Sequence, residues 1–238
     1  MSQPLACIEI GGSGVQTVVF AGGTHRFVDG VQVPSGARVA VAVPGHIVDD
    51  RVAAASTLGW TDVDPALELG LAVRPALVCN DAEAAALGEW VLRGRSDPRV
   101  AFIGVGSGIG GAVVDGGVVT HCNLFGHQPG FGSRLCSCGR RGCLETVAAG
   151  WVMPWPLDDT DIVSAAGAIA EALQAEPAAD RGLVVVGGGV AARYPQLIDR
   201  IGAALPERVV VSSARPAGAK SAAAWGMREL LGNGAVTR

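Results

Sequence analysis

The sequence is poor in charge and lacks long runs of any one residue type. Asp, Glu, Lys and Arg together make up 17% of its 238 residues, and 18 basic against 22 acidic residues leave a formal net charge of −4. Basic residues form no run, which argues against binding nucleic acid or an anionic membrane through bulk charge. No uncharged apolar stretch reaches the ~18 residues that a membrane-spanning helix needs. Partners of these two classes are therefore not expected.

A secretion signal and a disulfide framework are also missing. No Lys or Arg precedes the apolar residues at the N-terminus, so the start of the chain does not resemble an export signal, and we expect a cytoplasmic protein. Three of the six cysteines fall within eight residues, and the other three stand apart in apolar surroundings. In a chain without an export signal, such a local cluster favours a metal site over disulfides.

The sequence is rich in apolar residues and in glycine. Hydrophobic residues make up 49% of the chain, which excludes disorder as a global description. The length indicates one large domain or two small ones. The 35 glycines follow no G-X-Y period, so they serve turns and close backbone approaches.

Apolar runs alternate with glycine turns and Ala-rich segments, which predicts an α/β fold with mixed sheets. The expected strands are residues 5–10, 15–20, 37–43, 76–79, 100–105, 109–114, 183–186 and 208–211, and the expected helices are 82–92, 161–174, 194–205 and 219–232. A strand–glycine turn–strand unit occurs near the N-terminus and again from residue 100, which predicts two related lobes, with chance similarity of two hairpins as the alternative. No low-complexity linker is present, so we expect the lobes to pack across a cleft.

One histidine and three cysteines have the spacing of a zinc site. His127, Cys136, Cys138 and Cys143 supply one imidazole and three thiolates, a complete tetrahedral set for Zn²⁺. Four protein ligands leave no position for water, so the metal would be structural. Buried thiols that merely cluster are the alternative, and His121 is the other nearby histidine.

Three glycine turns, each after an expected strand, could bring backbone N–H groups close to phosphates. They are Gly11-Gly12-Ser13, Gly106-Ser107-Gly108 and Gly187-Gly188-Gly189. Any one of them alone is more often an ordinary turn. Three in one chain, two of them in matching units, predict a nucleotide site.

Polar residues also follow the buried strand at 76–79. Asp81 could accept a proton from a hydroxyl, and Asn80 could orient that hydroxyl. The alternative is that one of the two simply caps helix 82–92. Glu145 stands two residues after the last cysteine, which would hold its carboxylate near the metal loop, although alone it reads as a first-turn helix carboxylate.

Together these residues resemble the ROK family of sugar kinases and sugar-responsive repressors. The segments that carry the resemblance are Glu9-Ile10-Gly11-Gly12-Ser13, Pro44-Gly45, Asn80-Asp81 with the following AEAAALGE, Gly106 to Gly110, Gly126-His127, Cys136 to Glu145, and Gly187 to Val190. The run from Cys136 to Glu145 matches the family's zinc signature almost letter for letter, and this run is the most specific of the motifs.

The resemblance implies the actin-like ATPase fold, which is ribonuclease H-like and has two α/β lobes, a cleft between them and a zinc-binding loop. The expected N-terminal lobe is residues 1–97, joined by the C-terminal helix 219–238. The expected C-terminal lobe is residues 98–218 and contains the zinc loop 127–143. Family members are commonly dimers or tetramers, so a homo-oligomer is expected.

The resemblance also implies an ATP-dependent, glucokinase-like kinase acting on a hydroxyl of a hexose. Asp81 would be the general base, and Asn80, His127 and Glu145 would position the sugar, with Gly45 close to it. The phosphates of ATP, with Mg²⁺, would lie on the glycine turns. One ring nitrogen of His127 would bind the zinc while the other faces a sugar hydroxyl. The sequence names neither the sugar nor the phosphoryl donor.

Two positions depart from the family pattern. Glu9 stands at the phosphate site where the family has aspartate, and the extra methylene moves the carboxylate by about 1 Å. Leu124 stands where a glutamate normally bonds sugar hydroxyls, a loss of about 1–3 kcal/mol. Both favour, as the alternative function, a catalytically impaired sugar- or nucleotide-binding protein descended from the kinases. A repressor is disfavoured, because only eight residues precede Glu9.

Overall fold

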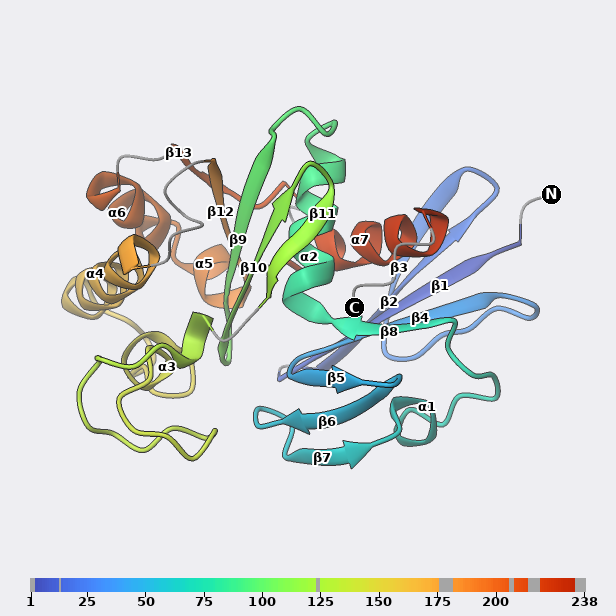
Figure 1. The fold of residues 1–238 in the computed structure, drawn as a ribbon, viewed down its shortest axis with the longest axis horizontal. Coiled ribbons are helices and arrows are strands. Elements are labelled where there is room, and N and C mark those ends of the chain that lie inside the picture. The colour runs from blue at the N-terminus through green and yellow to red at the C-terminus, as the bar shows by residue number, and fades with distance from the viewer. Residues whose placement is uncertain are drawn as a thin grey trace.

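The computed structural model describes residues 3–12, 14–122, 125–175, 182–205, 208–213 and 219–233. Within these ranges the chain forms two five-stranded sheets side by side, with a small three-stranded sheet at one end (Figure 1). The first large sheet contains β1 (Leu5–Gly11), β2 (Gly14–Ala21), β3 (Thr24–Asp29), β4 (Arg38–Val43) and β8 (Leu77–Asn80). The second contains β9 (Arg99–Val105), β10 (Ile109–Asp115), β11 (Val118–Cys122), β12 (Leu183–Gly187) and β13 (Arg208–Val211).

The two large sheets have the same topology. The strand order is β3-β2-β1-β4-β8 in the first and β11-β10-β9-β12-β13 in the second. In each sheet, three strands form an antiparallel meander. A fourth strand pairs in parallel with the first strand of that meander, and a fifth pairs in parallel with the fourth. This shared order confirms the expectation of two related α/β lobes, because a chance likeness between two glycine-rich hairpins would not extend to the parallel strands.

Two helices lie between the sheets. They are α2 (Asp81–Leu92) and α7 (Ala219–Asn233). One cluster of buried side chains joins them to both sheets, from Cys7 and Val18 in the first to Phe102 and Val185 in the second. The outer face of the second sheet is covered by α4 (Asp159–Ala175) and α6 (Gln196–Ala204), with the short helices α3 (Glu145–Ala148) and α5 (Gly189–Arg193) nearby (Figure 1).

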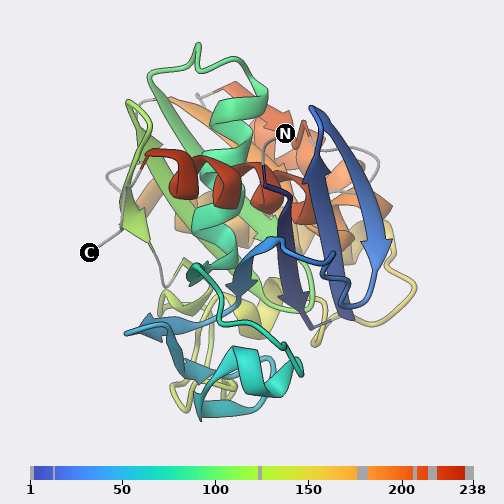
Figure 2. The same ribbon diagram turned by 90° about the vertical axis from the view of Figure 1, so that its right-hand side faces the viewer.

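A small sheet lies between β4 and β8 in the chain, and sequence patterning did not predict it. It consists of β5 (His46–Val48), β6 (Arg51–Ala55) and β7 (Trp60–Val63), and the short helix α1 (Pro65–Glu68) follows it. Figures 1 and 2 both place this sheet at the same end of the molecule as the loop 128–144. This arrangement puts the small sheet beside the candidate site.

The predicted lobe boundary at residues 97 and 98 falls in the connection between α2 and β9. The assignment of α7 to the first lobe is consistent with its contacts to β1, β2, β4 and β8. Residues 234–238 of that assignment lie outside the described residues, and the division into lobes stays a prediction. Among the helices that the structure describes, none combines the length and the apolar character that crossing a membrane requires.

The helices α2 and α7 pack against each other at two glycines, where there is no room for a side chain. A Cβ on Gly88 would collide with the carbonyl of Ala222, and a Cβ on Gly226 would collide with the carbonyl of Ala84. We expect Gly88→Ala to destabilise the protein by about 1–3 kcal/mol, because the helices must move apart. The melting temperature should then fall by about 2–10 °C in a thermal scan.

A matched control is available in α4. Gly167 is exposed, and a Cβ there would meet no atom within 4 Å. Gly167→Ala should raise stability by about 0.5–1 kcal/mol, as a glycine-to-alanine change in an open helix position usually does. Equal effects of the two substitutions would contradict a role for the crossing.

Candidate active site

A cleft of about 950 Å³ lies between the two large sheets and the small sheet. Most of the residues singled out from the sequence line it, namely Glu9, Gly11, Gly12, Gly45, Asn80, Asp81, Gly106, Ser107, Gly108, His127, Cys138, Glu145, Gly188 and Gly189. Cys136 and Cys143 lie behind this wall in the loop 128–144, and both are buried. Ser13 and Leu124 lie outside the described residues.

Two of the glycine turns meet across the cleft. A Cβ built on Gly12 would lie 2.8 Å from both the Cβ and the Oγ of Ser107. A Cβ on Gly108 would lie 2.5 Å from Glu145 Oε1 and 3.1 Å from the methyl group of Thr57, which belongs to the small sheet's connection. A side chain at Gly12 would collide with Ser107 of the second glycine turn, and one at Gly108 would collide with the side chain of Glu145 and crowd that of Thr57.

Only part of the third glycine turn lines the cleft. Gly188 has φ of 92°, and it packs so closely on the backbone of Val105 that a side chain is excluded. Gly188 and Gly189 line the cleft, whereas Gly187 is the last residue of β12 and is not among the lining residues. At Gly187 a Cβ would come within 3.0 Å of the Phe102 ring, so the packing of the sheet accounts for this glycine.

Asn80 ends β8 and caps α2. Its Oδ1 accepts hydrogen bonds from the backbone N–H groups of Ala82 at 2.9 Å and Glu83 at 3.1 Å, and its Nδ2 donates to the carbonyl of Gly45 at 2.9 Å. Gly45 has φ of 110° and packs against Ala55. Asn80 thus holds the Pro-Gly turn at the start of the small sheet, and one Nδ2 hydrogen is left for a ligand.

Asp81 is the first residue of α2 and is half-buried in the cleft wall. Its Oδ1 accepts a hydrogen bond of 2.8 Å from the backbone N–H of Ala82. Burial raises the pKa of Asp81 to about 6, although its backbone hydrogen bonds act in the opposite direction. A carboxylate with a pKa near neutrality, open to a cleft, is suited to accept a proton from a substrate.

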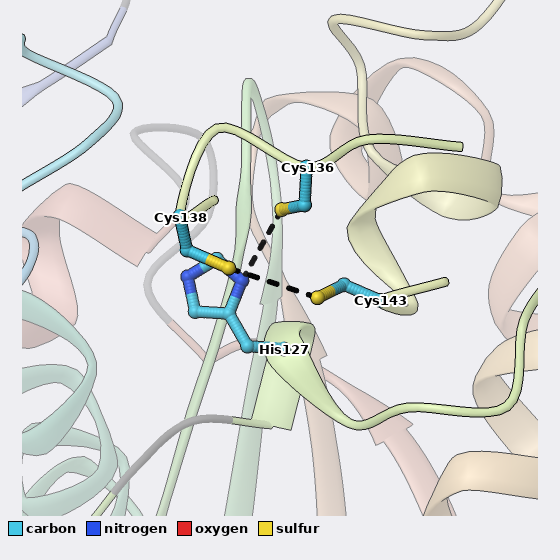
Figure 3. Close-up of side chains that lie close together, drawn as sticks. All are labelled: His127, Cys136, Cys138 and Cys143. Atoms are coloured by element: carbon cyan, nitrogen blue, oxygen red, sulfur yellow. Dashed lines mark hydrogen bonds between the residues drawn. The ribbon is translucent and has the colours of Figure 1, made fainter. Parts of the chain in front are cut away.

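The metal cluster fits zinc. The ligand atoms of His127, Cys136, Cys138 and Cys143 all lie within 4.8 Å of one another, and Figure 3 shows them converging. Cys136 Sγ is 3.5 Å from His127 Nδ1, and Cys138 Sγ is 3.7 Å from Cys143 Sγ. Tetrahedral zinc with bonds of about 2.0–2.3 Å spaces its ligands by about 3.5–3.8 Å, in agreement with these distances.

His127 has the orientation expected of a residue with two partners. It follows β11 as the last residue of the 3-10 helix Phe125–His127, and its Nδ1 faces the thiols while its ring lines the cleft. Burial, with a smaller effect of the Arg140 charge, lowers the pKa of His127, which favours the neutral ring that a metal requires. The side chain of His121, the other candidate ligand, lies outside the described part of the structure.

Glu145 lies between the cluster and the second glycine turn. It is 3% exposed, and its Oε1 accepts a hydrogen bond of 2.6 Å from the backbone N–H of Ile109. Its Oε2 is 3.8 Å from His127 Nδ1. Burial raises the pKa of Glu145, partly offset by that hydrogen bond. Glu145 therefore fixes the backbone directly after Gly108, a contact that sequence spacing did not indicate.

Several lining residues were missed by sequence reasoning. His46, Thr57 and Trp60 come from the small sheet and its connections, and no motif marked them. Glu83 and Arg140 also line the cleft. With Glu9, Asp81 and Glu145, the lining residues include four carboxylates and, among Arg and Lys, only the guanidinium of Arg140. Such a cleft would bind polyanionic phosphates only with a cation to offset the repulsion.

Comparison with known sequences identifies relatives of this chain. The sequence profile of the ROK family matches residues 7–154. A kanosamine kinase from Amycolatopsis mediterranei is 30% identical over 232 residues, which is 82% of this chain and 74% of that protein. A glucokinase from Halalkalibacterium halodurans is 34% identical over 122 residues. That match spans 47% of this chain and only 37% of the glucokinase.

Solved structures show the same fold. The ROK hexokinase from Thermus thermophilus aligns with a TM-score of 0.68 at 20% identity, covering 97% of this chain and all of that one. A ROK glucokinase from Streptomyces griseus, solved with glucose and AMPPNP, aligns with the same TM-score at 18% identity, covering 94% of this chain and 98% of its own. The family profile covers more than half of this chain, and the structural likeness extends over nearly all of it. The chain belongs to the ROK family.

Proposed function

We propose that this protein is an ATP-dependent sugar kinase that transfers the γ-phosphoryl group to a hydroxyl of a hexose, with Asp81 as general base. One observation carries the proposal: Asp81, with a pKa near neutrality, opens into the same cleft as two facing glycine turns and the ring of His127. The homology to kanosamine kinase and glucokinase supports the reaction class.

In the proposed reaction, Asp81 takes the proton from the acceptor hydroxyl. The hydroxyl oxygen then forms a bond to the γ-phosphorus, the bond from that phosphorus to the bridging oxygen breaks, and ADP leaves. His127, Glu145 and the free Nδ2 hydrogen of Asn80 would hold the other sugar hydroxyls, and the Gly45 turn would close one side of the site. These roles follow from the positions of the residues around the cleft.

Two metals belong to the proposal. Mg²⁺ would neutralise charge on the phosphates, and Glu9, which lines the cleft beside Gly11 and Gly12, is the carboxylate placed to hold it directly or through water. Zn²⁺ held by His127 and the three cysteines would stabilise the loop that carries them. The chemistry of transfer would be left to Asp81 and the residues that orient the sugar.

A coupled assay of ADP release over a panel of sugars tests the function. Glucose, mannose, kanosamine and N-acetylmannosamine are suitable, since homologues are named for acting on sugars of this kind. We expect turnover that depends on one of them, on ATP and on Mg²⁺. No sugar-dependent turnover by folded, zinc-loaded protein would overturn the proposal. Calorimetric binding of sugar or ATP without turnover would instead establish the binding-protein alternative.

The dependence of kcat/KM on pH should reflect the ionisation of Asp81. A general base acts when deprotonated, so protonation at low pH removes activity. With a pKa of about 6, kcat/KM for the sugar should fall about tenfold per pH unit below pH 6 and be level above it. The measurement is made at saturating ATP and Mg²⁺. A profile that stays level down to pH 4.5 would exclude Asp81 as the base.

We also propose that the protein assembles into a homodimer or a higher homo-oligomer, as the family resemblance implies. Light scattering on purified protein gives the oligomeric state directly.

A further inference from the structure

A carboxylate with no role in the proposed function is completely buried in α2. Glu89 is 0% exposed, although glutamate side chains are almost never fully buried unless they are paired. It lies on the same helix as Asp81, eight residues later and therefore about 12 Å further along the axis. Glu89 does not line the cleft. Any part that it plays in the reaction must therefore pass through the groups that surround it.

Three donors surround the Glu89 carboxylate, and two of them belong to the end of the second large sheet. The hydroxyl of Ser212, directly after β13, donates a hydrogen bond to Oε1. The backbone N–H of Ser213 lies 2.9 Å from both carboxylate oxygens. The third donor is Arg93 at the end of α2, whose Nε is 3.3 Å from Oε2 and whose Nη2 donates to the carbonyl of Val211 at 2.8 Å. This network fixes the helix to the end of β13.

The strand end that this network holds lies next to the third glycine turn. The backbone N–H of Ser212 donates a hydrogen bond of 2.9 Å to a carbonyl of β12, which extends the pairing of β13 with β12. A Cβ on Gly187, the last residue of β12, would lie 3.2 Å from the Cβ of Ser212. Gly188 and Gly189, which follow, line the cleft. Helix α2 therefore begins at the proposed base and is fixed, about two turns later, beside a turn that reaches the cleft.

Stability alone does not explain a buried carboxylate at this place. An apolar side chain of similar size often stabilises a protein as well as a buried ion pair does, because the ion pair has to lose its hydration. Hydrogen bonds to a charged group add direction, since they form only when donor and acceptor are aligned. The Glu89 contacts therefore define where α2 lies relative to the second sheet, and with it where the first residue of the helix lies.

We infer that Glu89 is a positioning residue for phosphoryl transfer, which holds α2 against the end of β13 and so keeps the Asp81 carboxylate aligned with the glycine turns. The inference rests on the proposed kinase function and deepens it by naming a residue that acts through the general base without contacting a substrate. Misplacing a reacting group by about 1 Å can cost about 100-fold in rate, so loosening this contact should be measurable in kcat.

A double-mutant cycle with Asp81 tests the inference. Glu89→Gln keeps the size of the side chain but replaces one acceptor oxygen with a donor group, which cannot accept from the donors around it. In steady-state kinetics we expect kcat to fall about tenfold, while the KM values for sugar and ATP change by less than about twofold. In the Asp81→Asn protein the same substitution should lower kcat by less than about twofold, because no base is left to align. Equal losses in both proteins would overturn the inference.

Thr17→Val is the matched control, because it also removes a buried hydrogen-bonding group. Thr17 is 0% exposed on β2, its hydroxyl donates to the carbonyl of Gly30 at 2.6 Å, and it does not line the cleft. Both variants should melt earlier than the unaltered protein. At an assay temperature below both melting points, only Glu89→Gln should lose kcat. A similar loss in Thr17→Val would mean that reduced stability alone lowers activity, and the inference would fail.

Hydrogen exchange measures the same alignment without turnover. Glu89→Gln should speed exchange of the backbone N–H groups of residues 82–85, at the start of α2, by about threefold or more, and Thr17→Val should leave it unchanged. Faster exchange confined to residues 211–213 would assign Glu89 a local structural role and contradict the inference. If the unaltered, folded protein phosphorylates no sugar, the kinase proposal fails, and the exchange pattern alone decides whether Glu89 holds the start of the helix.

Discussion

Replacing Asp81 with asparagine is expected to lower kcat by about 10²–10⁴-fold, the usual contribution of a positioned general base. The amide is nearly the same size, and its oxygen can still accept the 2.8 Å hydrogen bond from the N–H of Ala82 that Asp81 accepts now. The cap of α2 by Asn80 is also untouched. The substitution therefore removes the proton acceptor and leaves the architecture, so the KM for ATP should change little in steady-state kinetics.

The melting temperature of Asp81→Asn distinguishes a loss of the catalytic base from a loss of folding. Burial raises the pKa of Asp81 above the value of the unfolded chain, so the folded protein holds this proton more tightly and the ionised carboxylate costs stability above pH 6. The Asp81→Asn protein should consequently melt at the same temperature as the unaltered one or higher at pH 8. The difference should shrink as the pH falls from 6 toward 4. A variant that loses activity and also melts earlier at pH 8 would contradict the assignment.

The local motifs were the part of the site that the sequence could predict. The four residues of the His/Cys cluster lie within seventeen residues, and the glycines at 139 and 142 indicate the tight turns between them. Asn80 and Asp81 were identifiable because a buried strand ends just before them and an Ala-rich helix begins. The sequence left open which of the two caps the helix. The structure shows that Asn80 does so and leaves the Asp81 carboxylate facing the cleft.

Contacts across the cleft were not predictable. Gly12 and Ser107, and likewise Thr57 and Gly108, meet only after both sheets and the small sheet have formed. No periodicity links residues so far apart in the chain. For the same reason, the close packing of α2 and α7 at their glycines could not be predicted, because the sequence of a helix does not indicate which element its glycine contacts.

Edge strands and short strands were also missed. All but one of the residues of β3 are exposed, so this strand lacks the apolar alternation that marks a half-buried strand. Strands β5 to β7 have three to five residues each, and the turn between β5 and β6 has positive φ at Asp49 and Asp50. The central strands, buried on both faces, were predicted to within one or two residues, because continuous apolar runs are their direct consequence.

Loss of the zinc site is the second change from which we expect a large effect. The loop 128–144 contains little regular structure, and a few backbone hydrogen bonds, such as Cys136 N–H to the carbonyl of Arg140, shape it. Cys138→Ala should reduce bound zinc from about one per chain to nearly none and lower the melting temperature by about 5–15 °C. Native mass spectrometry and a thermal scan measure both. Cys7→Ala removes a buried thiol outside the cluster and should keep the metal.

Two substitutions of His127 distinguish its role as a metal ligand from its proposed contact with the sugar. Cys₄ sites hold zinc as well as Cys₃His sites do, so His127→Cys should keep zinc and stability. It removes the ring nitrogen that faces the cleft, and kcat/KM for the sugar should fall by about 10–100-fold through the lost hydrogen bond. His127→Ala should lose both metal and activity. If His127→Cys retains full kcat/KM, the imidazole serves only the metal, and the acceptor sugar must be held by Glu145 and Asn80.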